Sequence, residues 1–190
     1  MGVDIYGKSP KLTGKRPEFN YDDENTTDEQ KDEFWRALEK WEKNNPGYYF
    51  RSNWWGWRPI VQICKHAAEQ FELDFNLDWN HNDGKGLDNW QECNALADAL
   101  EKVIAQEDNL IDDEDVIYCN MGGWSTRGNG SVVDDGITMM LNRDYPYGTI
   151  MFSGIVGDGG AIYEPTHSTP LWLVKEFILF LKNCGGFSIW

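Results

Sequence analysis

The run of residues 48–59, YYFRSNWWGWRP, constrains the fold of this chain more than any other feature. It places three tryptophans and two arginines in one short segment. Aromatic rings bury large areas, and an arginine can stack on a ring or pair with a carboxylate or phosphate. The run therefore predicts either an anchor of the core or the wall of a binding site. The residues that would form such a wall are Arg51, Asn53, Trp54, Trp55, Trp57 and Arg58.

Length and composition predict one folded domain spanning residues 1–190. The chain is 41% hydrophobic and 14% aromatic, which suffices for a packed core and argues against disorder. The opening residues lack the basic and apolar regions of a signal peptide, and no stretch approaches the roughly 20 apolar residues of a membrane span. We therefore expect a soluble, cytoplasmic protein that does not contact a membrane.

The net charge of −15 argues against direct nucleic-acid binding, because the surface field would repel phosphates. Eight carboxylates lie in residues 18–33 and six in residues 107–115. Such runs are usually solvated surface. They could also bind a basic host protein by imitating phosphate charge. Calcium is a weaker interpretation, since the oxygen positions and central glycine of an EF-hand loop are missing.

The four cysteines, at positions 64, 93, 119 and 184, show no C-x-x-C spacing. This argues against a zinc site and against a compact disulfide framework. We expect reduced, mostly buried thiols.

Four helices are predicted from caps and apolar spacing. The first follows a capping box at residues 27–30 and stops at residues 44–47, and the second starts at Pro59 and runs to Phe71. The third is capped by Asp88 and runs to about residue 106, and the fourth opens at residues 169–170 and stops at 185–186. The fourth is apolar around most of its circumference, so we expect it to be central.

Strands are predicted at residues 3–7, 116–119, 136–141 and 149–153, the last two forming a hairpin or an edge strand. Helices and strands occur in separate runs without regular alternation. This favours an α+β fold, with about four helices on a small, mainly antiparallel sheet.

Two loops hold polar residues that a ligand could use. Residues 78–87, DWNHNDGKGL, precede a helix start, where unpaired N–H groups favour an anion or a sugar. The same composition is typical of an ordinary turn. Residues 120–130 are rich in glycine but match no phosphate-binding motif. The candidate ligand residues here are Trp79, His81, Asp83, Trp124 and Arg127.

No conventional catalytic arrangement is visible, and we expect neither a cofactor nor a metal. The histidines at 66, 81 and 167 have no metal-ligand spacing, and no nucleophile elbow is present. If the chain were an enzyme, Asp78, His81 and Asp83 would be the candidates for a small hydrolase. The sequence favours a protein that is not an enzyme.

Two motifs carry a resemblance to a known group of proteins. The opening MGVDIYG and the block at residues 49–59, YFRSNWWGWRP, resemble short, functionally uncharacterised proteins of bacteriophages and prophages. That group has an M-G-x-D-x-Y-G start and a Y-F-R-x-N-x-W-x-W-R-P block. The likeness covers mainly the first third of the chain and implies origin, with no activity to carry over.

These observations lead us to expect a phage- or prophage-type accessory protein that acts by binding, such as an acidic inhibitor of a host defence or nucleic-acid enzyme. One alternative is a nucleotide- or sugar-binding protein that uses the tryptophans and arginines. Another is the hydrolase named above. A further possibility is that the tryptophans are simply core.

Overall fold

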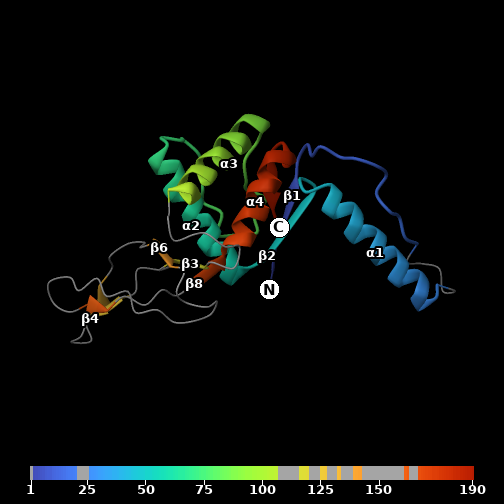
Figure 1. Ribbon diagram of the computed structural model, residues 1–190, viewed down its shortest axis with the longest axis horizontal. Helices are drawn as coiled ribbons and strands as arrows, with labels where there is room; N and C mark the ends of the chain where they lie inside the picture. Colours follow the sequence, from blue (N-terminus) through green and yellow to red (C-terminus); the bar gives the residue numbers. More distant parts are fainter. Residues whose placement is uncertain are drawn as a thin grey trace.

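The computed structural model describes residues 2–20, 26–106 and 169–190, together with the backbone of residues 167–168 and of five short strands between 106 and 167. These strands are β3 (Val116–Cys119), β4 (Ser125–Arg127), β5 (Val132–Val133), β6 (Met139–Asn142) and β7 (Ala161–Ile162). The described chain contains four helices and antiparallel strands (Figure 1), which confirms the α+β class.

A three-stranded antiparallel sheet holds the two ends of the described chain together. Its strands are β1 (Gly2–Gly7), β2 (Tyr49–Asn53) and β9 (Phe187–Ile189), in the order β2-β1-β9. Apolar and polar residues alternate along them, so one face turns inward. The hydrophobic residues buried on that face are Val3, Ile5, Phe50, Phe187 and Ile189.

Three helices pack together to form the body of the molecule (Figure 1). They are α2 (Trp54–Gln70), α3 (Trp90–Ala105) and α4 (Leu171–Cys184). As expected, α4 is central: its apolar side chains lie in the same buried cluster as those of α2, α3 and the sheet. Within the described residues, no helix is long and apolar enough to cross a membrane.

The backbone of the short strands forms two further three-stranded sheets. The first has the order β6-β3-β8 and the second the order β5-β4-β7, all pairs antiparallel. Strand β8 (His167–Pro170) leads directly into α4 and contacts α2. It therefore links the first sheet to the helices of the body.

Helix α1 (Asp28–Asn44) projects from one side of the body as an arm, with β1 and β2 lying between it and α4 in Figure 1. The arm has its own small apolar cluster, separate from the main core. Trp41 is buried there, 5.0 Å from the ring of Tyr48, and its Nε1 donates a hydrogen bond to the carbonyl of Gly14 at 3.3 Å.

Asn45, just after the last turn of α1, fastens the arm to the preceding segment. Its side chain is fully buried. The Nδ2 group donates to the carbonyls of Trp41 at 2.7 Å and Thr13 at 3.1 Å, and Oδ1 accepts from the Thr13 N–H at 2.5 Å. One side chain therefore satisfies three backbone groups where the chain turns from the arm into β2.

Two helix starts differ from the sequence prediction. Helix α2 begins at Trp54, five residues before Pro59, because the Asn53 side chain caps it by accepting from the Gly56 N–H at 2.8 Å. Pro59 lies inside the helix, where it lacks a donor. Helix α3 is capped by Asn89, since the predicted cap, Asp88, instead accepts from Lys8 Nζ at 2.6 Å.

Only some of the predicted strands are found in the structure. Residues 116–119 form β3 as predicted, and of residues 136–141 the described part belongs to β6. The predicted strand at 149–153, and with it the hairpin, lies outside the described residues. The prediction missed six short strands: β2, β4, β5, β7, β8 and β9.

The anchor at Asn45 can be tested by Asn45→Ala. Losing three hydrogen bonds at a buried site should cost about 1–3 kcal/mol. The loss should be local to the arm, so amide hydrogen exchange should quicken across α1 while α3 and α4 keep their protection. Asn44→Ala, at the exposed neighbouring position, is the control. Equal acceleration throughout the molecule would contradict a separately packed arm.

Candidate functional site

The structure divides the aromatic run between the core and the surface. Trp57 is fully buried, and its Nε1 donates a hydrogen bond to the carbonyl of Trp79 at 2.9 Å. Trp79 is also fully buried, and the two indoles stack with centroids 6.3 Å apart and planes 21° from parallel. Both were candidate ligand residues, but neither exposes surface to a ligand. Both indoles therefore belong to the core.

The helical geometry of α2 explains the division. Because Asn53 starts the helix, Trp54 and Trp57 lie three residues apart on the face toward the core, while Trp55 and Arg58 share the outer face. Trp54 is half-buried and packs against the core. Gly56 lies between the two faces, where a Cβ would come 3.3 Å from Cδ2 of Leu173 in α4. The first turns of α2 and α4 are therefore in close contact.

Large side chains are exposed at the starts of both helices. Trp55 is 64% exposed, Arg58 is exposed, and Trp172 in the first turn of α4 is 40% exposed. We call these three residues the helix-start surface. Exposed tryptophans cost solvation free energy that contact with another molecule recovers. Trp172 was not predicted as a site residue because it belongs to a helix that is apolar around most of its circumference, and its outward position shows only in the structure.

Arg51, another predicted site residue, belongs to a cross-strand group on the outer face of the sheet. Its Nε lies 3.6 Å from Oδ1 of Asp4, directly opposite in the strand register. The Tyr49 hydroxyl donates to the same Asp4 oxygen. Partial burial, reinforced by this hydrogen bond and by the Asp4 charge, raises the pKa of Tyr49. The arrangement gives Arg51 a structural partner as well as an exposed position.

The loop at residues 78–87 is an ion-paired surface turn. Lys85 Nζ lies 3.0 Å from Oδ2 of Asp78 and 2.9 Å from Oδ2 of Asp83, and His81 is exposed nearby. The hydrogen bond from Lys85 is the main reason that the pKa of Asp83 is lowered. A carboxylate held in its ionised form accepts a proton less readily. The loop unites the three hydrolase candidates, but its geometry supports a structural role better than catalysis.

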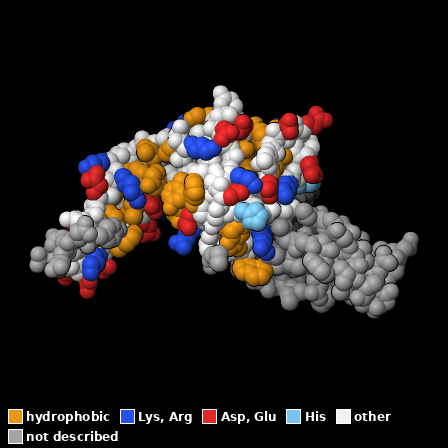
Figure 2. Space-filling view, turned by 180° about the vertical axis from the view of Figure 1, so that it is seen from behind, with side chains coloured by type: hydrophobic (Ala, Val, Ile, Leu, Met, Phe, Trp, Pro, Cys, Tyr) orange, Lys and Arg blue, Asp and Glu red, His pale blue; other side chains and the backbone are white. Residues whose placement is uncertain are grey.

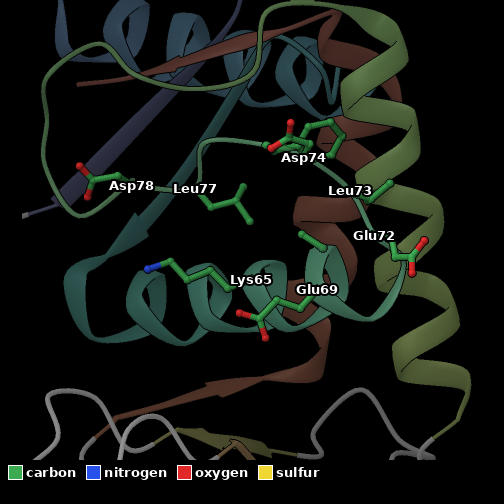
Figure 3. A pocket seen from close by; sticks show the side chains of 9 residues that line it. Lys65, Glu69, Glu72, Leu73, Asp74, Leu77 and Asp78 are labelled. Carbon is green, nitrogen blue, oxygen red and sulfur yellow. The ribbon is translucent and has the colours of Figure 1, made fainter.

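A groove of about 490 Å³ lies between α2 and the segment that follows it (Figure 3). Lys65 and Glu69 reach it from α2, and the side chain of Leu77 faces it from the other side (Figure 3). The acidic groups around it point in different directions and Asp78 is engaged by Lys85. The groove is therefore open and lacks the convergent polar groups of an active site. The residues that line it are Lys65, Ala68, Glu69, Glu72, Leu73, Asp74, Phe75, Leu77 and Asp78.

Charges of both signs lie among each other on one face of the described chain (Figure 2). Figure 2 shows Lys and Arg side chains interspersed with Asp and Glu side chains on the face that it presents. Of the two acidic clusters, residues 21–25 and 107–115 lie outside the described chain, as does Trp124, and the side chain of Arg127 is not described. Among the described residues, no group of three or more histidine, cysteine or acidic side chains could hold a metal ion.

The split of the aromatic run predicts opposite effects of two tryptophan substitutions. Trp57→Ala should lower the free energy of unfolding by about 3–5 kcal/mol, because it removes a buried indole and its hydrogen bond. Trp55→Ala should change it by less than about 1 kcal/mol. Urea unfolding measures both. If Trp57→Ala cannot be purified, Trp57→Phe should still be less stable than Trp55→Ala; comparable losses would refute the division.

Two ion pairs, Lys85–Asp83 in the loop and Lys8–Asp88 just after it, predict separate effects on two carboxyl groups. Asp83 and Asp88 should both titrate below the usual aspartate pKa, because Lys85 and Lys8 stabilise their ionised forms. Because the folded-state pKa is the lower one, each pair favours the fold above the unfolded pKa of about 3.9. That contribution is lost as the pH falls through the folded pKa. In carboxyl NMR titrations, Lys85→Ala should return only the pKa of Asp83 to the usual aspartate range. Lys8→Ala should do the same only for the pKa of Asp88.

Comparison with known proteins identifies no relative of this chain. No protein-family model, no curated protein and no solved structure matches it. The resemblance to phage and prophage proteins therefore stays a prediction. Function has to be argued from the residues of the chain itself.

Proposed function

We propose that this chain is a phage- or prophage-type accessory protein that acts by binding another protein through its helix-start surface. The observation that carries the proposal is the position of Trp55, which is 64% exposed although the neighbouring Trp57 is fully buried. An indole exposed to this extent offers apolar area that a partner protein can cover.

The chemistry of the helix-start surface suits a protein partner. Tryptophan and arginine are the residue types most enriched among those that dominate protein–protein binding energy. Trp55 and Arg58 lie three residues apart on one helix face, so both can enter a single contact. Trp172 extends that contact to α4, whose first turn adjoins that of α2 at Gly56 and Leu173. Two packed helices present these groups on a rigid base.

The charge of the chain indicates what kind of partner it would meet. A net charge of −15 attracts a basic protein at long range and speeds encounter. Nucleic-acid enzymes carry basic grooves, so an acidic protein that docks beside such a groove could keep the substrate out. We propose a host defence or nucleic-acid enzyme as the target, with the helix-start surface supplying affinity and net charge supplying steering.

Two other functions have less support from the geometry. A nucleotide or sugar site normally encloses most of its ligand in a formed cavity. The stacked rings of Trp57 and Trp79 are buried, so no ligand can reach them. The groove at Lys65 is too open to enclose a ligand. A hydrolase would need Asp78 and Asp83 free to exchange protons, whereas Lys85 contacts both. Asp83→Asn would remove turnover if that activity existed.

The proposal predicts that partner capture depends on Trp55 and Arg58. Tagged wild-type protein should retain one host protein from bacterial lysate, with recovery falling at least about tenfold in Trp55→Ala and in Arg58→Ala because each removes a hot-spot side chain. Trp35→Ala is the matched control, because Trp35 is also a largely exposed tryptophan but lies on the arm. Quantitative mass spectrometry of the captured proteins measures the effect.

Three outcomes would contradict the proposal. The first is capture that is equal for Trp55→Ala and wild type, and the second is an equal loss in the Trp35→Ala control. The third is native mass spectrometry that finds a retained small molecule and no protein, which would favour the ligand-binding alternative. Loss of capture at 300 mM compared with 50 mM salt would support electrostatic steering as a separate contribution, since screening lengths shorten to a few ångströms over roughly that range.

A further inference from the structure

Two cysteine sulfurs meet at the contact between α3 and α4. Sγ of Cys93, near the start of α3, lies 3.6 Å from Sγ of Cys184, the last residue of α4. Both side chains are fully buried, and 91 positions separate them in the sequence. A disulfide requires sulfurs about 2.05 Å apart. The two sulfurs are therefore in contact as free thiols.

Both cysteines lie where the backbone is fixed. Asn89 caps α3 by accepting from the Glu92 N–H at 3.0 Å, immediately before Cys93. The carbonyl of Cys184 accepts from the Ser9 N–H at 3.0 Å, and the chain then turns through Gly185 and Gly186, whose φ angles are +62° and +99°. A side chain at these positive φ values would be strained. The two sulfurs are therefore held in each other's reach.

The two thiols also differ in their hydrogen bonding. The Cys184 thiol donates to the Cys93 sulfur, and this hydrogen bond is the main cause that lowers the pKa of Cys93, although burial opposes it. The backbone N–H of Gly186 and the charge of Lys8 act in the same direction. Cys93 is thus the sulfur more easily made a thiolate, which is the nucleophilic form. Cys184 lies beside it and can therefore act as the second thiol, which attacks Cys93 once Cys93 is oxidised.

We propose that Cys93 and Cys184 form a reversible disulfide when the protein meets a peroxide. The Cys93 thiolate attacks one peroxide oxygen, so an S–O bond forms, the O–O bond breaks and hydroxide leaves. The Cys184 sulfur then attacks the Cys93 sulfur. An S–S bond forms, the S–O bond breaks, and the departing oxygen takes up the Cys184 proton and leaves as water. The hydroxide from the first step takes up the proton that Cys93 released, so two thiols are oxidised and one hydrogen peroxide is reduced to two waters.

The bond would fasten the end of α4 to the beginning of α3. It would close a loop containing all of the chain between residues 93 and 184, and cross-linking so long a loop greatly restricts the unfolded state. Because both sulfurs are buried, oxidation has to wait for a local opening, and the finished bond is shielded from reductants. This inference does not rest on the proposed binding function.

The experiment uses the full chain treated with hydrogen peroxide under native conditions. Remaining thiols are then alkylated in denaturant, and the peptides are mapped by mass spectrometry without reduction. We expect two of the four thiols to resist alkylation and a peptide that links Cys93 to Cys184. Dithiothreitol added in denaturant, where the bond is no longer shielded, should restore both thiols. The melting temperature should rise by roughly 5–15 °C on oxidation.

Matched variants identify the pair. Cys93→Ala and Cys184→Ala should each abolish the peroxide-induced rise in melting temperature, whereas Cys119→Ala should keep it. Cys64→Ala should also keep the rise, although loss of its buried side chain lowers the starting value. A linkage through Cys64 or Cys119, a covalent dimer, or four alkylated thiols after peroxide treatment would each overturn the proposal. The peptide map of the unmodified chain gives this answer even if a variant fails to fold.

Discussion

The hydrogen-bonded stack of Trp57 on Trp79 is the interaction on which the rest of the structure depends. Trp57 comes from α2 and Trp79 from the segment that follows it, so the stack closes that segment over the core. Trp57 also meets Phe177 of α4 edge-on at 5.4 Å, and Trp79 meets Phe187 of β9 at 5.0 Å. Two indoles thus join two helices, the sheet and the connecting segment.

The segment closed by this stack covers an edge of the sheet. The Phe187 N–H donates to the carbonyl of Leu87 at 2.8 Å, and the Ile189 N–H donates to that of Lys85 at 3.0 Å. Between them, Gly86 lies so close to β9 that a Cβ would stand 2.0 Å from the Phe187 carbonyl oxygen. The glycines of this loop therefore serve close backbone packing. An edge strand covered in this way cannot pair with another chain.

Much of the fold could be predicted from the sequence, because helix caps and apolar spacing are local signals. The capping box of α1 and the glycine stop of α4 are where they were expected. The start of α2 was misplaced because a proline usually marks the first helical position, and burial of Trp57 outweighs that local preference. Strand β9 depends on pairing with residues almost at the other end of the chain, which no local pattern reports.

The candidate site could be predicted only as a group of residues. The sequence singled out Trp55 and Trp57 together, yet which indole points outward depends on the helix phase, and a start at Pro59 leaves both outside the helix. The Asn53 cap fixes that phase. Likewise, the loop at 78–87 could be read as a ligand site until Lys85 was seen between Asp78 and Asp83.

The separate packing of α1 has a consequence for how this chain tolerates change. Effects of substitutions add when the sites are distant and share no partners. The cluster around Trp41 shares none of its members with the core around Trp57. Substitutions around Trp41 and around Trp57 are therefore expected to combine additively, so the surface of the arm can change step by step while the core of the body stays the same.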